Sequence, residues 1–163
     1  MDGITQYLNT DLDLLSADDL TALAAAFEVR GLMPTRVIRY HDGQWQWHAR
    51  FCGNSTDDEC YDEPEPTIAA MLAVIEALDP PLRSAWAGCS RREFDIGYEC
   101  GREPFHFHQG LSAGILARLV AAGASLRVTL YADQDRRPAE RDGVCDREVS
   151  SAEPGAGAIR KSE

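Results

Sequence analysis

Residues 4–16 read ITQYLNTDLDLLS, and the alternation within this stretch decides our fold prediction. Large apolar side chains and polar side chains alternate along it. One side would carry Leu8, Leu12 and Leu14, and the other Tyr7, Asn9, Asp11 and Asp13. A period of two is typical of a strand with one buried face. We therefore expect a strand whose leucines face the core and whose aspartates face water.

The residues after this strand predict a helix. Ser16 is a candidate N-cap, with Asp19 three residues later as a variant of the capping box. Apolar residues then follow at helical spacing: Leu20, Leu23, Ala24 and Phe27. Gly31 is a natural C-terminal stop, since glycine tolerates the left-handed backbone that ends many helices.

Residues 35–51, TRVIRYHDGQWQWHARF, predict a hairpin. Asp42 and Gly43 form a favoured two-residue turn, because both tolerate a positive φ angle. The return strand would place four apolar residues on one face: Trp45, Trp47, Ala49 and Phe51.

The rest of the patterned region predicts a helix, a strand, a helix and a strand. The first helix begins at Thr67 and ends before Pro80 and Pro81, which cannot supply the backbone donor of a continuing helix. Its apolar stripe is Ile68, Met71, Leu72, Ile75 and Leu78. The next strand would bury Phe94, Ile96 and Tyr98. The next helix begins at Ser112 as its N-cap and ends at Gly123, and its apolar residues are Ile115, Leu116, Leu119 and Val120. The last strand would turn Leu126, Val128 and Leu130 toward the core.

The element order is therefore β-α-β-β-α-β-α-β, an α+β protein. Its first six elements match the ferredoxin-like split β-α-β core, and a helix and a strand are appended. We expect one sheet with helices on one face. Residues 1–133 would form a single domain, and residues 134–163, which have few large apolar side chains, a disordered C-terminal tail.

The acidic charge lies mainly in the first half of the chain. The 163 residues carry a net charge of −11, and residues 1–70 hold 13 Asp and Glu against 4 Arg. Such a field repels phosphate backbones and favours cationic partners, so we expect no nucleic-acid partner. Solubility alone is the alternative reason for the charge.

Apolar stretches, the N-terminal residues and the cysteines indicate the cellular location that we expect for the protein. No stretch approaches the roughly 20 apolar residues of a membrane span, so we expect no membrane association. The N-terminus has no basic segment followed by an apolar block, and five irregularly spaced cysteines do not suggest a disulfide framework. Both observations favour the cytoplasm.

Asp11 and Asp13 resemble the Asp-x-Asp nucleophile motif of haloacid-dehalogenase-like phosphatases. In that family one carboxylate attacks phosphorus and the other acts as acid and base beside Mg²⁺. Such sites also need a lysine, and the chain's one lysine, Lys161, lies in the expected tail. We therefore favour the reading of this pair as the solvent face of a strand, without a cofactor.

Cysteines and histidines offer a second possible chemistry. The candidates for a thiophilic metal are Cys52, Cys60, Cys89, Cys100, His106 and His108. Their Cys-x7-Cys and His-x-His spacings differ from the compact pairs of structural zinc sites. Cys100 with His106 or His108 is the best candidate for a nucleophile and its base. A small metal-dependent hydrolase that uses Asp11, Asp13 and this Cys/His loop stays open as the alternative function.

One resemblance extends over most of residues 4–131. NTDLDL, EPTIAAMLAVIEALDPPLRSAW and the closing LVAAGASLRVTLY are similar to uncharacterised small bacterial proteins of a domain-of-unknown-function family. Some relatives of that type are thought to be immunity proteins against toxins. The resemblance implies a toxin as the partner and assigns no catalytic residue. The acidic charge favours a basic partner, such as a nuclease toxin.

We therefore expect a non-enzymatic binding protein of the immunity type, which docks a basic partner protein through its acidic N-terminal half. The expected contact residues are Asp11, Asp13, Asp57, Asp58, Glu59, Asp62 and Glu63. The sequence leaves the oligomeric state undetermined.

Overall fold

The computed structural model describes residues 4–42, 44–52 and 63–132. These residues form five strands and four helices. In chain order they are β1 (Gln6–Ser16), α1 (Thr21–Glu28), β2 (Met33–Asp42), β3 (Gln44–Cys52), α2 (Pro64–Glu76), α3 (Pro80–Gly88), β4 (Arg91–Cys100), α4 (Ala113–Ala121) and β5 (Ser125–Ala132). No helix of this part of the chain is long and apolar enough to cross a membrane.

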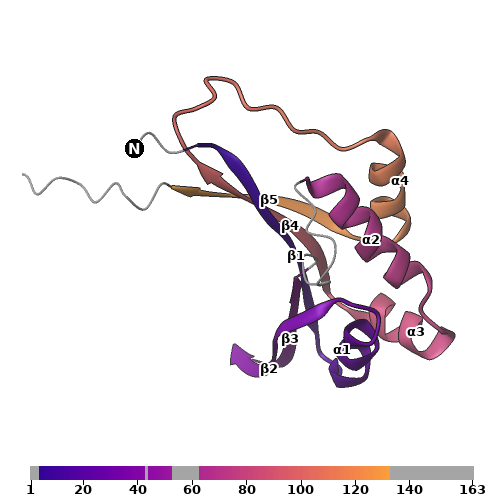
Figure 1. Cartoon of the computed structure of the whole chain (residues 1–163). Coiled ribbons are helices and arrows are strands. Elements are labelled where there is room, and N and C mark those ends of the chain that lie inside the picture. The colour runs from indigo at the N-terminus through magenta and orange to yellow at the C-terminus, as the bar shows by residue number, and fades with distance from the viewer. Residues whose placement is uncertain (1–3, 43, 53–62, 133–163) are drawn as a thin grey trace, which may run out of the picture.

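All five strands belong to one mixed sheet in the order β2-β3-β1-β4-β5. β1 lies at the centre, antiparallel to both β3 and β4, and β2 pairs antiparallel with β3. β5 is parallel to β4, as the α4 crossover between them requires. The helices lie on one face of the sheet (Figure 1). The expected α+β class with one sheet is confirmed.

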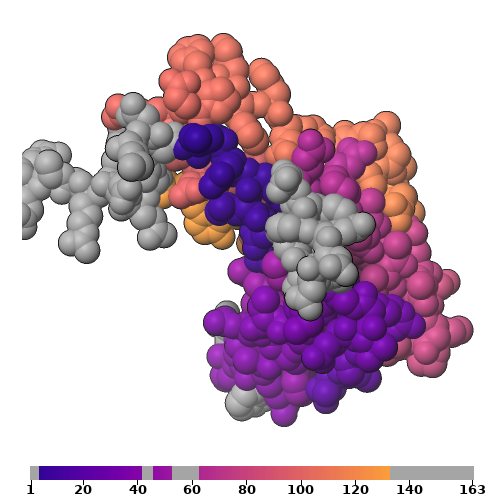
Figure 2. Space-filling model, in the orientation of Figure 1, coloured from indigo at the N-terminus to yellow at the C-terminus, as the bar shows by residue number. Residues whose placement is uncertain are grey.

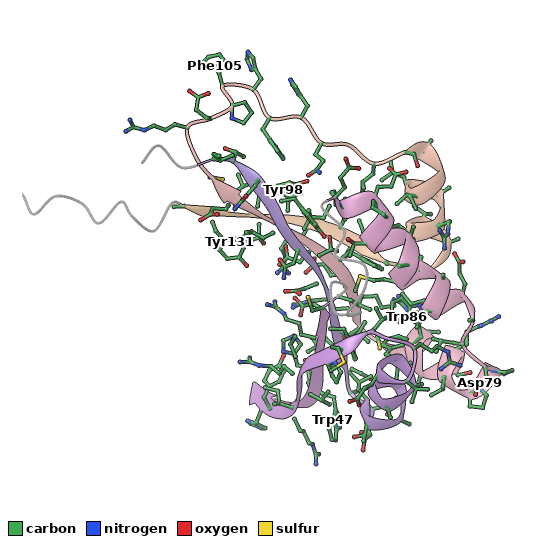
Figure 3. All side chains as sticks on the ribbon, viewed as in Figure 1. Trp47, Asp79, Trp86, Tyr98, Phe105 and Tyr131 are labelled. Atoms are coloured by element: carbon green, nitrogen blue, oxygen red, sulfur yellow. The ribbon has the colours of Figure 1, made fainter. Side chains whose placement is uncertain are left out.

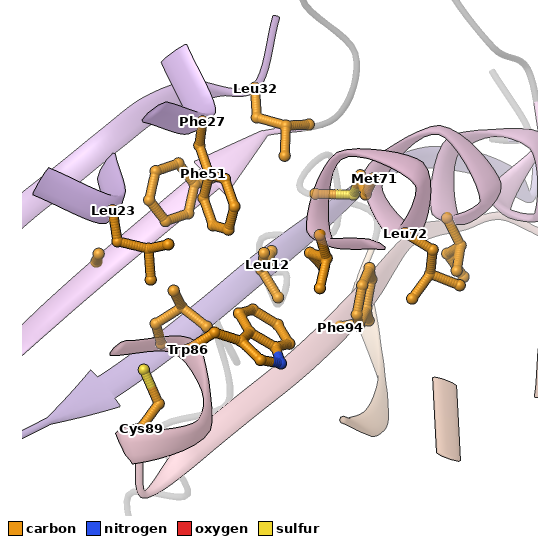
Figure 4. Packing of buried hydrophobic residues seen from close by; sticks show 14 of the residues in the cluster. Leu12, Leu23, Phe27, Leu32, Phe51, Met71, Leu72, Trp86, Cys89 and Phe94 are labelled. Atoms are coloured by element: carbon orange, nitrogen blue, oxygen red, sulfur yellow. The ribbon is translucent and has the colours of Figure 1, made fainter. Parts of the chain in front are cut away.

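The core fills the space between the sheet and the helices. Leu12 and Leu14 of β1 are fully buried against side chains from α1 and α2. Phe27 stands edge-on to Phe51, with ring centroids 5.0 Å apart, and also contacts Trp86 of α3 (Figure 4). Burial of such large side chains contributes most of the folding free energy in a domain of this size.

The strand at residues 4–16 forms, but its two faces are not those expected throughout. The pairing of β1 with β4 shifts between Tyr7 and Asn9. A bulge of this kind adds one residue, so the alternation reverses on its N-terminal side. Tyr7 therefore packs against the core and donates a hydrogen bond to Thr67 of α2, whereas Leu8 is 40% exposed. The prediction for these two residues was wrong.

The expected capping box is also wrong. Ser16 ends β1 as a buried residue, and its Oγ accepts a hydrogen bond from the backbone N–H of Asp18. Asp19 accepts one from the N–H of Thr21, where α1 begins after Leu20. Both side chains thus stabilise the turn between strand and helix. The predicted stop holds, since Gly31 has a φ of 87°.

The proline pair begins a helix that the sequence analysis did not predict. α2 ends at Glu76, and Pro80 and Pro81 open α3. Proline is well suited to the first turn of a helix, where its missing N–H would have no partner. The Asp79 side chain caps α3 by accepting from the N–H of Leu82 at 3.0 Å. α3 then brings Trp86 into the core, where its Nε1 donates to the carbonyl of Ala122.

The predicted hairpin is formed by β2 and β3, with Ala49 and Phe51 buried. Gly43 of its turn lies outside the described residues, as does the expected tail at residues 134–163.

The prediction for the last helix and strand is only half right. Ser112 caps α4 as expected and Ile115 and Leu119 are buried. In contrast, Leu116 and Val120 of α4 are exposed, and so are Leu126, Val128 and Leu130 of β5. β5 is an edge strand, and the helices do not cover this side of it.

Candidate functional site

The sheet face away from the helices carries most of the charged side chains of the central strands. We call it the polar sheet face, and its members share a side because paired strand residues point the same way. They are Asn9, Asp11 and Asp13 of β1, His48 and Arg50 of β3, Glu93, Asp95 and Gly97 of β4, and Arg127, Thr129 and Tyr131 of β5.

Asp13 is held tightly by β3. Its side chain is 3% exposed, and Arg50 donates to both carboxylate oxygens, from Nε at 2.8 Å and from a terminal nitrogen at 2.7 Å. His48 Nε2 lies 3.2 Å from Oδ1 of the same carboxylate. Burial alone would raise the pKa of Asp13, but the hydrogen bonds and charge of Arg50 outweigh it, so this pKa is lowered. Asp13 therefore stays ionised and fully paired.

Asp11, two residues earlier, is much less well neutralised. Its nearest cation is again Arg50, at 3.6 Å, while Asn9 donates a hydrogen bond at 3.1 Å. Burial is the largest cause and raises the pKa of Asp11; the charge of Arg50 and a hydrogen bond with Cys52 lower it, the negative charges of Asp13 and Asp95 raise it, and the net direction is upward. The side chain keeps 15% of its surface exposed. Among the described residues, Asp11 is thus a partly exposed carboxylate without a cation of its own.

Asp95 and Glu93 continue the acidic row on β4. Asp95 pairs directly opposite Asp11 in the sheet, accepts from the hydroxyl of Thr129 at 2.6 Å and lies 3.6 Å from Arg127. Glu93 accepts from the same Arg127. The guanidinium groups of Arg50 on β3 and Arg127 on β5 thus flank four carboxylates on the two strands between them, β1 and β4.

Gly97 makes room at one end of the polar sheet face. A Cβ at this position would lie 2.7 Å from Oδ1 of Asn9 and 3.3 Å from the Tyr131 ring. Tyr131 lies near the end of β5 (Figure 3). The Asn9 side chain, which donates to Asp11, can occupy its place because residue 97 has no side chain.

The predicted contact residues divide into three groups. Asp11 and Asp13 lie together on the polar sheet face. Glu63 is exposed and precedes α2, on the helix-covered side of the sheet. The others, Asp57, Asp58, Glu59 and Asp62, lie outside the described residues.

Sequence reasoning missed the cationic half of this site and the second acidic strand. The signal for Glu93 and Asp95 was present, because they alternate with Phe94 and Ile96, which were expected to face the core. The same alternation places Arg50 and Arg127 on the polar sides of their strands, but their pairing with carboxylates depends on which strands are neighbours, and no local pattern reports that.

The cysteines and histidines do not gather into a ligand set within the part of the chain that the structure describes. Cys52, Cys89 and Cys100 are free thiols, and the rings of His106 and His108 stack with centroids 6.0 Å apart. In that same part, no group of three or more His, Cys, Asp and Glu side chains is arranged to hold a metal ion.

In comparisons with known proteins, no family model, curated protein or solved structure matches the chain. The fold and the site define a small α+β domain with a charged, partly neutralised sheet face.

Proposed function

We propose that the protein is a non-enzymatic binding protein whose polar sheet face receives a cationic side chain of a basic partner protein. The observation that carries this proposal is Asp11. It is a partly exposed carboxylate with a raised pKa, and its nearest cation, at 3.6 Å, is already committed to Asp13. A lysine or arginine of a partner would supply the missing charge.

Three further features support a binding role. Asp11 lies between two other carboxylates, Asp13 and Asp95, so the local field attracts cations. The net charge of −11 would steer a basic protein from a distance. Finally, Asp13 engages both its oxygens with Arg50, and a carboxylate so paired is a poor nucleophile or general base.

The finer features are part of the same proposal. The partner would be a basic toxin of the nuclease type, the protein an immunity-type inhibitor in the bacterial cytoplasm, and Asp57, Asp58, Glu59, Asp62 and Glu63 would form a second acidic contact. The first four strands would follow the ferredoxin-like plan, because α1 joins β1 to β2 and β3 lies between these two strands.

The experiment that tests the proposal compares two baits that lose one negative charge each. Asp11→Asn removes the carboxylate of the polar sheet face, and Glu28→Gln removes an exposed carboxylate at the end of α1. Wild-type protein and both variants would capture partners from an extract, and the captured protein would then be titrated at several salt concentrations.

We expect Asp11→Asn to weaken the captured partner's binding by about tenfold or more, since a partner charge would lose its buried counter-ion. Glu28→Gln should leave binding within about twofold, because exposed charges away from a contact contribute little. Equal binding by the two variants would contradict the proposed role of Asp11.

A further inference from the structure

The apolar surface around β5 is the feature that the proposed function does not use. We call it the apolar edge, and it consists of Leu116 and Val120 of α4 and Leu126, Val128 and Leu130 of β5. These side chains are between 39% and 78% exposed. Together they expose on the order of 500 Å² of apolar surface, which is the size that marks interaction sites on soluble proteins.

A cleft adjoins the apolar edge. Its volume is about 430 Å³, and its lining includes the three β5 residues together with Tyr98 and Phe107. Phe107 belongs to residues 101–112, which project from the described part of the chain as the lobe after β4 (Figure 2). Gln109 also lines the cleft, and no described residue donates a hydrogen bond to its buried Oε1. Among residues 4–42, 44–52 and 63–132, nothing satisfies this oxygen or covers the apolar lining.

The two edges of the sheet differ in their protection. β2, at one edge, contains Pro34, two arginines and a register shift between Pro34 and Arg36. Prolines, charges and bulges of this kind prevent another strand from pairing with an edge. β5, at the other edge, has no proline, and its register with β4 runs without a shift from Ser125 to Ala132. Within the described chain β5 pairs with β4 alone.

Charge also permits two apolar edges to meet. Although the chain carries 27 Asp and Glu, neither α4 nor β5 contains one. Their charged residues are Arg118, paired with Glu76, and Arg127, paired with Glu93. This is a nearly neutral surface on a protein whose other surfaces repel one another, so self-association is least opposed here.

We propose that the apolar edge binds a second copy of this chain, with β5 pairing antiparallel to β5 of the partner around a two-fold axis at Val128. This register places Val128 opposite its own counterpart and Leu126 opposite Leu130. An axis at residue 127 would instead set Arg127 against Arg127, and one at residue 129 would pair Leu126 with Ala132. The edge strand then obtains backbone partners, and the apolar surfaces cover each other.

The size of the surface fits a dimer. Stable interfaces bury roughly 800 Å² per partner. The apolar edge supplies more than half of that amount, and the backbone edge of β5 adjoins it.

The test uses the symmetry of the proposed axis. Wild-type protein, Val128→Lys, Val128→Glu and an equal mixture of the two variants would be examined by sedimentation velocity over a wide concentration range. Val128 is 54% exposed, so both substitutions are compatible with the folded monomer, which circular dichroism would verify. The matched control is Val29→Lys, because Val29 is 86% exposed and lies at the end of α1.

We expect dimers for the wild type and for Val29→Lys. Each Val128 variant should dimerise at least about 100-fold more weakly, since like charges would face each other across the axis. Their mixture should regain the dimer, because lysine then faces glutamate. Val120→Lys, on the flank of the apolar edge, should weaken the dimer without any rescue by Val128→Glu.

Three results would overturn the proposal. The first is a monomeric wild type at every concentration. The second is a mixture that stays monomeric although both variants are folded. The third is a wild-type monomer that becomes a dimer when residues 133–163 are removed, since this segment would then be the occupant of the apolar edge.

Discussion

Asp11 and Asp13 should respond in opposite directions to the same substitution. Asp13→Asn removes the charge that Arg50 binds through two short hydrogen bonds, and it turns an amide N–H toward the guanidinium. Breaking a buried pair costs about 3–5 kcal/mol, but Arg50 is 35% exposed and can regain water. We therefore expect a loss of about 2–3 kcal/mol at pH 7, below the range for a fully buried pair.

Asp11→Asn removes a carboxylate that is poorly paired and lies beside two others. Asparagine keeps the oxygen that accepts from Asn9. We expect the stability to rise by up to about 1 kcal/mol, the usual size for a partly exposed charge. Both variants change the net charge by the same amount within one strand, so each is the control of the other.

The pH dependence gives the two predictions a second readout. The pKa of Asp13 is lowered in the folded protein, so its contribution is present above the ordinary value of 3.8 and is lost as the pH falls through the folded pKa. The pKa of Asp11 is raised, so its penalty is absent below 3.8 and appears as the pH rises through the folded pKa. The effect of Asp11→Asn should therefore disappear below 3.8, and that of Asp13→Asn should become smaller as the pH falls below 3.8 toward the lowered pKa of Asp13.

Urea unfolding at pH 7 and near pH 3, followed by tryptophan fluorescence, measures these changes. A slope of about 1–3 kcal/mol per molar urea makes the Asp13→Asn loss a shift of roughly 0.7–3 M in the midpoint. The reasoning is refuted if the two variants shift the midpoint in the same direction at pH 7, or if the Asp13→Asn loss persists unchanged in acid.

Two further predictions concern Cys89 and Gly97. Burial raises the pKa of Cys89 to about 11, so iodoacetamide should label it at least about tenfold more slowly than Cys52 and Cys100 in the native protein, as peptide mass spectrometry would show. Equal native rates would contradict this burial. Gly97→Ala should cost about 1–2 kcal/mol in urea unfolding, because the new methyl group displaces the Asn9 side chain. Adding Asn9→Ala should recover part of that loss, and strict additivity would argue against the contact.

Local patterns in the sequence were enough to predict most of the elements and much of the core. Every member of the stripe from Ile68 to Leu78 is buried, since helical spacing reports one face directly. The errors concern helix boundaries and strand faces that depend on the rest of the fold and not on the local sequence. Pro80 reads equally well as the end of one helix or the beginning of the next, and the bulge after Tyr7 reverses an alternation without a local signal.

The candidate site was predictable only in its acidic half. The alternation around Asp11 and Asp13 places them on one face of β1, but their different environments depend on Arg50, which is 37 residues away from Asp13 in the chain. Likewise, Leu126, Val128 and Leu130 have the pattern of a buried face, and only the position of β5 at the sheet edge leaves them exposed. Sequence periodicity reports that a face is apolar, and it cannot report what covers that face.

The two proposed surfaces have a joint consequence. Residues opposite each other in an antiparallel pair point to the same side, so joining two copies through β5 would place both polar sheet faces on one side of a continuous sheet. A dimer would thus present two Asp11 sites in the same direction. Against a partner immobilised at high density, the wild type should dissociate more slowly than Val128→Lys, because a second site can rebind before the first is lost. In solution, with the partner in excess, the affinity per chain should be equal. A difference in solution would mean that the apolar edge itself contacts the partner, and equal dissociation at high density would mean that the two sites are not presented together.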